Sequence, residues 1–222
     1  MTAETALGLI EEIGVIPSVR AASAQDARFA AEAVHAAGLG IIEVTMTTPN
    51  ALALIGVLSK SMPDALVGAG TVLDATTARR CIDAGAGFIS SPGFAPAVVQ
   101  STVRRDVLAL PGVLTPTDLM TALDAGASAV KVFPCEPFGG PALIRALKKP
   151  FPNIRLIAAG GINQQSAADF IRAGAVAVGV GAELIPKRAV ASHDRDWIAE
   201  LVHRFRHAVH DARADNSHTV DR

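Results

Sequence analysis

The sequence predicts a single-domain α/β protein built as a (β/α)8 TIM barrel, on three observations. Short apolar runs rich in Val, Ile, Leu and Ala alternate with helical segments along the 222 residues. The runs are apolar throughout rather than at every second residue, which is typical of parallel strands covered on both faces. A phrase made of a helix end, a glycine, a short turn and a strand recurs along the chain. Strand–helix units of this kind, closing on themselves, make the barrel.

The recurring phrase locates four strands, and four more lie between its copies. In the phrase, the glycine fits the position after a helix end, where a positive φ is needed and a Cβ is penalised. The copies read HAAGLGIIEVT from His35, DAGAGFISSPG from Asp83, DAGASAVKVFP from Asp124 and RAGAVAVGVGA from Arg172. The other candidates are GVIPSVR (14–20), ALVGAGTV (65–72), VLALPGVL (107–114) and IRLIAAGG (154–161).

The domain organisation follows from where this pattern stops. We expect residues 1–186 to form the barrel and residues 187–222 to form an amphipathic helix followed by a polar, disordered tail. The helix is indicated by apolar residues at helical spacing: Trp197, Ile198, Leu201, Val202, Phe205 and Val209. A doubly wound open sheet is the competing architecture. No G-x-G-x-x-G follows the first strand, which weighs against a dinucleotide-binding fold.

Composition narrows the class of protein. Half of the residues are apolar, yet no uninterrupted apolar run reaches the ~20 residues of a membrane span. The N-terminus lacks the pattern of a signal peptide. A net charge of −1 gives no attraction to nucleic acid or to anionic membranes. Cys81 and Cys135 are expected to be free, buried thiols. We therefore expect a cytoplasmic protein whose partner is a small molecule, with no nucleic-acid or membrane partner.

Two charged residues interrupt otherwise apolar strands. Lys131 lies within AVKVF and Glu43 within IIEVT, and each follows the glycine of its phrase by the same interval. A charge in such a place costs several kcal/mol unless it is paired, solvated or neutralised. The equal interval predicts that both side chains reach the same height of the barrel. Because active sites of such barrels lie at the carboxyl ends of the strands, the two are expected to meet in one cavity.

A lysine and a carboxylate in one apolar cavity favour Schiff-base chemistry. An amine must be unprotonated to attack a ketone, and apolar surroundings disfavour the charged ammonium. A nearby carboxylate can then move protons through the carbinolamine, imine and enamine steps. The alternative is a buried Lys–Glu pair that serves structure only. The strands contain no histidine, which argues against a metal centre among them, so no metal and no cofactor are expected.

At these residues the chain resembles the class I 2-keto-3-deoxy-6-phosphogluconate / 4-hydroxy-2-oxoglutarate aldolases. The resemblance runs from about residue 14 to residue 184 and rests on motifs in order: IIEVT, VGAGTV, ISSPG, LPGVLTPTDLMTALDAG, VKVFP, GGPALIRALKKPFPNI and AAGGI. It implies a small TIM barrel, commonly a homotrimer, that uses no metal. Lys131 would be the Schiff-base lysine and Glu43 the general acid/base.

The resemblance also implies the substrate contacts. Thr71 would hydrogen-bond the pyruvate carboxylate, and Pro92 and Phe133 would form the walls around it. Backbone N–H groups would bind the phosphate at Gly160, Gly161, Gly181 and Ala182. Glycine-rich loops after strands seven and eight are also the usual phosphate site of such barrels.

The chain departs from the family pattern at two places. Thr47 stands where many members have an arginine for the substrate carboxylate, and Arg20 in PSVRA fits that role instead, as in another branch of the family. Ala182 stands where many members have a serine, which leaves only backbone donors for phosphate.

These residues predict a class I aldolase that cleaves 2-keto-3-deoxy-6-phosphogluconate, or its galactonate epimer, to pyruvate and glyceraldehyde 3-phosphate. A second hypothesis is an aldolase for unphosphorylated 4-hydroxy-2-oxoglutarate or a related keto acid, which Ala182 favours. A third, from another class, is a phosphate-binding barrel that is non-catalytic or an isomerase.

Overall fold

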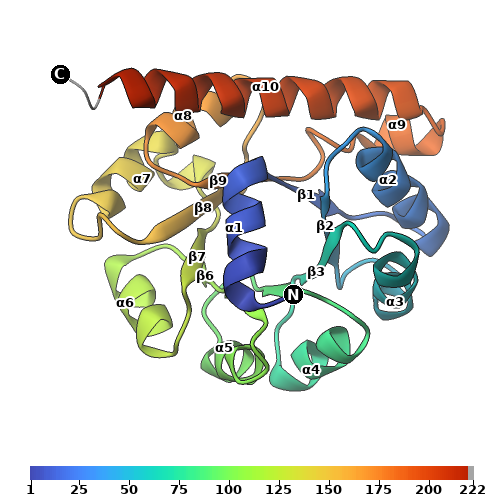
Figure 1. Cartoon of the computed structure of the whole chain (residues 1–222), viewed down its shortest axis with the longest axis horizontal. Coiled ribbons are helices and arrows are strands. Elements are labelled where there is room, and N and C mark those ends of the chain that lie inside the picture. The colour runs from blue at the N-terminus through green and yellow to red at the C-terminus, as the bar shows by residue number, and fades with distance from the viewer. Residues whose placement is uncertain (220–222) are drawn as a thin grey trace.

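The computed structural model describes residues 1–219, with side chains as far as residue 215. Parallel strands form a nearly closed barrel with helices packed around it (Figure 1), in the sheet order β5-β4-β3-β2-β1-β9-β8-β7-β6. The predicted single-domain α/β barrel is confirmed, and the open doubly wound sheet is excluded. The strands are β1 (Val15–Val19), β2 (Ile41–Thr45), β3 (Leu66–Gly70), β4 (Phe88–Ser90), β5 (Leu108–Leu110), β6 (Gly112–Val113), β7 (Ala129–Val132), β8 (Arg155–Ala159) and β9 (Ala177–Val180).

The fifth predicted strand, 107–114, is divided at Pro111 into β5 and β6. Proline has no N–H to donate to a neighbouring strand, so the ladder is interrupted there. β5 pairs with β4 and β6 pairs with β7, and the N–H of Lys131 donates to the Pro111 carbonyl at 2.9 Å. The divided strand therefore spans the gap between β4 and β7, and the observed strands correspond to the eight predicted positions.

The recurring glycines end helices as expected. Gly38, Gly85, Gly126 and Gly174 all have positive φ, between 85° and 108°. After each of them, the next N–H donates to the carbonyl five residues back, as Ala127 does to Ala122 at 3.1 Å. The surrounding helices are α2 (Ala24–Ala36), α3 (Ala51–Ser61), α4 (Ala75–Asp83), α5 (Pro96–Val103), α6 (Pro116–Asp124), α7 (Pro141–Lys148), α8 (Ala167–Arg172) and α9 (Lys187–Ala191). A short 3-10 helix, η1 (Glu136–Phe138), precedes α7.

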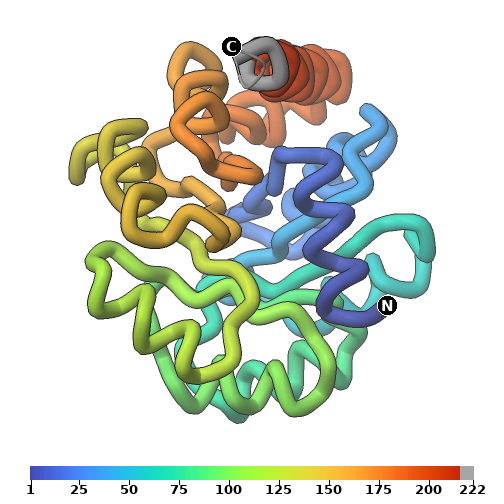
Figure 2. Tube along the Cα trace, turned by 60° about the vertical axis from the view of Figure 1, so that its left-hand side comes forward, coloured from blue at the N-terminus to red at the C-terminus, as the bar shows by residue number. Residues whose placement is uncertain are grey.

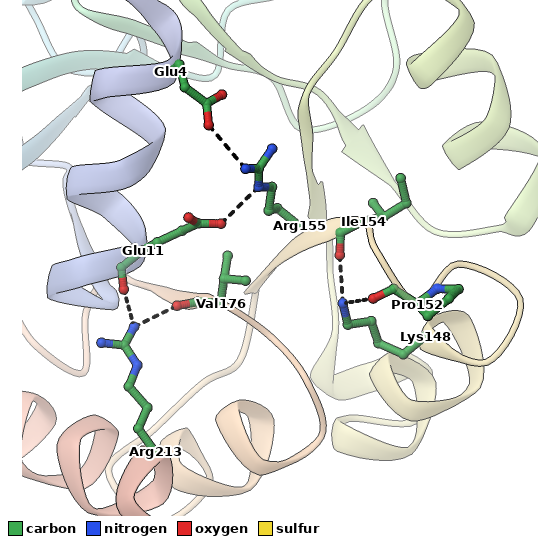
Figure 3. Close-up of polar contacts among 8 residues, drawn as sticks. All are labelled: Glu4, Glu11, Lys148, Pro152, Ile154, Arg155, Val176 and Arg213. Carbon is green, nitrogen blue, oxygen red and sulfur yellow. Dashed lines mark hydrogen bonds and ion pairs between the residues drawn. The ribbon is translucent and has the colours of Figure 1, made fainter. Parts of the chain in front are cut away.

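Helix α1 (Ala3–Ile13) covers the end of the barrel where the strands begin (Figure 1). Arg155, the first residue of β8, donates to the carboxylates of Glu4 and Glu11, both at 3.1 Å (Figure 3). Arg213 of the C-terminal helix donates to the Glu11 carbonyl and, at 2.9 Å, to the Val176 carbonyl just before β9. Burial lowers the pKa of Arg213. These contacts close that end, so the open cavity is left at the carboxyl ends of the strands.

The C-terminal helix α10 (Arg195–Thr219) lies along the outside of the barrel against α8 and α2 (Figures 1 and 2). Its buried residues are Ala212 and five of the predicted stripe, Ile198, Leu201, Val202, Phe205 and Val209, whereas Trp197 is 39% exposed. The helix extends into the stretch expected to be a disordered tail. The rest of that predicted tail, residues 220–222, lies outside the described residues.

Candidate active site

A cavity of about 610 Å³ opens at the carboxyl ends of the strands. Side chains from β1, β2, β7 and the loops after β3, β4, β8 and β9 line it. The structure brings together all the predicted site residues except Thr47: Arg20, Glu43, Thr71, Pro92, Lys131, Phe133, Gly160, Gly161, Gly181 and Ala182. The strand-end argument and the family resemblance together therefore named residues that lie in one cavity.

Lys131 enters this cavity from β7. Its ammonium donates a hydrogen bond to the Ser90 hydroxyl at 2.5 Å and lies 5.5 Å from the centre of the Phe133 ring. The side chain is half-buried. Because its backbone is paired with β6 and β8, the base of the side chain is held rigidly.

Glu43 is buried, with 5% of its surface exposed, and it lines the same cavity from β2. The Ser18 hydroxyl, on the neighbouring β1, donates to its carboxylate at 2.7 Å. Gly70 leaves room for this carboxylate, because a Cβ on Gly70 would lie 2.4 Å from the Glu43 Oε1. Among the described residues, neither Glu43 nor Lys131 takes part in an ion pair. The two side chains therefore do not neutralise each other as a structural ion pair. The Glu43 carboxylate and the Lys131 ammonium can both contact a ligand in the cavity.

Thr71 follows β3 in a left-handed conformation, with φ of 59°. This conformation is uncommon for a β-branched residue and is typically found where function requires it. The adjacent N–H of Val72 donates to the Ser90 carbonyl at 3.1 Å, which ties this turn to β4. Thr71 is therefore held in the cavity wall near the strand that contacts Lys131.

Thr47 is the predicted residue that the structure leaves outside the cavity. Its side chain is exposed, and its hydroxyl lies 3.0 Å from that of Thr45. Strand β2 ends at Thr45, so the alternation of inward and outward side chains does not continue to Thr47. Thr45 lines the cavity instead.

The glycine-rich loops form the end of the cavity after β8 and β9. Gly160 and Gly161 have φ of 89° and 88°. A Cβ on Gly160 would lie 2.8 Å from the Pro134 backbone, so a side chain is excluded there by space as well as by conformation. In the described residues, no backbone hydrogen bond uses the N–H groups of Gly160, Gly161, Gly181 or Ala182. Such free N–H groups can bind an anion.

Cys135 lies close to the site but is not equipped as a nucleophile. Both Cys81 and Cys135 are free and buried, as expected. Burial raises the pKa of each thiol to about 11. Both thiols therefore remain protonated at neutral pH, and the reactive form, the thiolate, is scarce.

The family model of KDPG and KHG aldolase matches residues 8–201. The chain belongs to this family. The 2-dehydro-3-deoxy-phosphogluconate aldolase of Treponema pallidum is 34% identical over 192 residues, covering 86% of this chain and 91% of that protein.

Solved structures share this fold. A KDPG aldolase from Legionella pneumophila, with pyruvate captured as a covalent carbinolamine intermediate, has a TM-score of 0.83 and 30% identity, covering 89% of this chain and 96% of that one. A cube-shaped cage designed by fusing symmetric oligomeric domains has a TM-score of 0.86 and 28% identity, covering 95% of this chain and 77% of that one.

Three residues at or beside the cavity are not among the predicted site residues. Ser18 and Ser90 contact the two charged residues, and Lys187 lines the cavity beside the glycine-rich loops. A serine at a strand end is uncharged, so it does not stand out as Lys131 and Glu43 do. Lys187 lies beyond the loop after β9, so its position depends on the fold of that loop and not on a strand. The alternating polarity of GVIPSVR could have indicated Ser18, and Ser90 stands at the end of the strand in ISSPG, but nothing in the sequence singles out Lys187.

Neither a cluster of metal-ligating side chains nor a membrane-spanning helix is found among the described residues. They contain no group of three or more His, Cys, Asp or Glu side chains placed to hold a metal ion. No described helix is long and apolar enough to cross a membrane.

Proposed function

We propose that this chain cleaves 2-keto-3-deoxy-6-phosphogluconate, or its galactonate epimer, to pyruvate and glyceraldehyde 3-phosphate through an imine on Lys131. The observation that carries the proposal is the placement of Lys131 and Glu43 in one cavity without an ion pair between them. An amine and a proton-transferring carboxylate, both free to meet a ketone, are the minimum that this reaction requires. Family membership, and a relative that holds pyruvate as a carbinolamine, support the same chemistry.

The reaction begins when Glu43 takes a proton from the Lys131 ammonium and the neutral amine attacks the C2 ketone of the substrate. Glu43 gives the proton with which water leaves the carbinolamine, and the iminium that remains withdraws electrons from the C3–C4 bond. Glu43, now a carboxylate, takes the proton of the C4 hydroxyl through a water. The C3–C4 bond then breaks, the aldehyde leaves, and the enamine is protonated and hydrolysed to pyruvate. Each proton that Glu43 gives or takes is recovered within one cycle.

The two ends of the cavity match the two anionic ends of this substrate. Arg20 and Thr71 would hold the carboxylate beside the ketone, with Pro92 and Phe133 as apolar walls. The distal phosphate would lie on the free N–H groups of the loops after β8 and β9. This arrangement gives every charged group of the substrate a donor.

Lys187 favours the phosphorylated substrate over 4-hydroxy-2-oxoglutarate. It lines the cavity at the glycine-rich end, and among the described residues it has no ion-pair partner. Its ammonium would add a positive charge where Ala182 lacks a hydroxyl. A phosphate dianion gains more from that charge than a carboxylate does. A non-catalytic barrel gives no use to a lysine and a glutamate placed together in this way, and an isomerase, which can use the carboxylate as a base, needs no imine on the lysine.

Replacing Lys187 with methionine is expected to raise the KM for the phosphorylated substrate about 3- to 10-fold, the range of an exposed charge contact. The KM for 4-hydroxy-2-oxoglutarate should change less, and the difference should shrink at high salt because exposed charges are screened. Arg188→Met is the matched control, since Arg188 is also exposed but does not line the cavity. Equal effects on both substrates would contradict this role for Lys187.

Borohydride reduction in the presence of pyruvate tests the proposed function directly. An imine on Lys131 would be reduced to a stable secondary amine, which peptide mass spectrometry locates. Cleavage of phosphorylated and unphosphorylated substrates is then compared on the same preparation. Absence of any adduct, together with absence of cleavage, would leave the non-catalytic or isomerase barrel as the better account.

We further propose that the protein acts as a cytoplasmic homotrimer. The family resemblance supports this assembly, and the designed cage of symmetric oligomeric domains contains a chain of the same fold. Large apolar side chains on the surface, including Leu73, Met120 and Phe138, are between 55% and 66% exposed and would be covered by a partner copy. Light scattering should give three times the mass of the chain, and a monomer at micromolar concentration would refute the proposal.

A further inference from the structure

Ser90 is a fully buried serine that contacts the reacting nitrogen. None of its surface is exposed, and its hydroxyl oxygen accepts a hydrogen bond from the Lys131 ammonium at 2.5 Å. Its backbone is paired with Leu110 on β5, and its carbonyl accepts from the Val72 N–H at 3.1 Å. The hydroxyl is therefore attached to a backbone that is held on both sides.

The next residue, Ser91, shows that burial alone does not explain this contact. Ser91 is also buried, with 2% of its surface exposed, but its hydroxyl donates to the Gly93 carbonyl at 2.7 Å within its own loop. Ser90 makes no such local bond among the described residues, and its hydroxyl is directed to Lys131. The two adjacent serines thus differ in partner: one stabilises the loop and the other meets the lysine.

The nitrogen that Ser90 contacts changes its bonding during the proposed reaction. The free ammonium has three N–H groups, whereas the iminium has one, which lies in the plane of the C=N bond. A fixed acceptor for that single N–H sets the rotation of the whole C=N plane. The rotation decides whether the C3–C4 bond of the substrate stands perpendicular to that plane, as it must for its electrons to enter the iminium.

We propose that Ser90 is a further catalytic residue, whose hydroxyl accepts the iminium N–H on Lys131 and fixes the orientation of the C=N plane. This inference rests on the proposed function, because it requires an imine on Lys131. No bond to Ser90 forms or breaks, and the serine keeps its own proton. Its contribution is to hold the reacting plane while Glu43 transfers the protons.

Exchange of the pyruvate methyl protons in D2O isolates this step. The exchange requires only iminium and enamine formation, so it does not depend on the aldehyde end of the substrate. Ser90→Ala should slow the exchange about 10- to 100-fold, the range expected for a lost hydrogen bond to a charged group. Ser90→Cys should slow it similarly, since sulfur is a weak acceptor of nearly the same shape. Ser91→Ala, the matched control, should exchange at the wild-type rate.

The pH dependence of the exchange rate separates this role from a simpler one, in which Ser90 only stabilises the free ammonium. If Ser90 only stabilised the free ammonium, its removal would favour the neutral, nucleophilic amine, and exchange at neutral pH would become faster. If Ser90 holds the iminium, Ser90→Ala and Ser90→Cys exchange more slowly than the wild type at every pH. The other charged groups that line the cavity, Arg20, Glu43, Glu183 and Lys187, are unchanged in every variant, so they contribute equally to all the profiles.

The outcomes are distinguishable. Wild-type protein that neither exchanges pyruvate protons nor forms an adduct on Lys131 would refute the proposed function itself. Wild-type protein that does both, with Ser90→Ala or Ser90→Cys folded and within about twofold of its exchange rate, would overturn the role of Ser90 alone. Thermal unfolding of each variant shows whether it is folded, and the cysteine variant keeps the test valid if the alanine variant is not.

Discussion

Lys131→Ala is expected to reduce cleavage of 2-keto-3-deoxy-6-phosphogluconate to the uncatalysed background. Without the amine no imine forms, and the C3–C4 bond has no acceptor for its electrons. The other cavity residues can still bind the substrate, so the loss should appear in kcat. The measurement is pyruvate release followed by a coupled assay, with borohydride trapping on the same sample to show that the adduct has disappeared.

Lys60→Ala is the control for this experiment. Lys60 lies exposed on α3, outside the cavity, so its loss should leave both turnover and the borohydride adduct unchanged. Because Lys131 is half-buried and its hydrogen bond goes to a serine rather than to an acid, Lys131→Ala should also fold. Turnover near the wild-type rate in folded Lys131→Ala would end the imine mechanism.

The fold was predictable because its repeat unit depends on backbone conformation. Gly38, Gly85, Gly126 and Gly174 each adopt a positive φ that other residues adopt only under strain, so their spacing marks where helices end and strands begin. The division at Pro111 was less visible, since an apolar run with one proline is also typical of an edge strand. Helix α1 was not predicted as the cover of the barrel, because its tertiary contacts through Arg155 and Arg213 join residues far apart in the chain.

The site was predictable to the extent that it carries charge. Lys131 and Glu43 stand out because a charge within an apolar strand is costly. Each follows the glycine of its repeat by the same number of residues, which predicts that both side chains lie at the same height in the barrel. Ser90 carries no such cost, and only the pairing of β4 beside the broken fifth strand shows that it faces Lys131. Thr47 was expected in the cavity from its position in the family motif. The turn after β2 leaves it exposed.

Glu43→Gln is expected to slow turnover by ~10²–10⁴-fold, the usual contribution of general acid–base catalysis. Glutamine has nearly the same shape, and its amide oxygen can still accept the hydrogen bond from Ser18. It neither gives nor takes a proton, so dehydration of the carbinolamine and removal of the C4 hydroxyl proton both lose their catalyst. The pyruvate adduct should still form on Lys131, only more slowly, which borohydride trapping at timed intervals would measure.

Ser18→Ala separates the charge of Glu43 from its position. This variant keeps the carboxylate but removes the hydroxyl that donates to it, so we expect a loss of about 10-fold, the size of one hydrogen bond to a charged group. A graded series, with Ser18→Ala between wild type and Glu43→Gln, would mean that the carboxylate transfers protons from a held position. Equal losses in the two variants would mean instead that the carboxylate transfers protons only while the Ser18 hydroxyl holds it in place. A Glu43→Gln variant that turns over near the wild-type rate would contradict the acid–base role of Glu43, and a water or substrate group would then have to carry the protons.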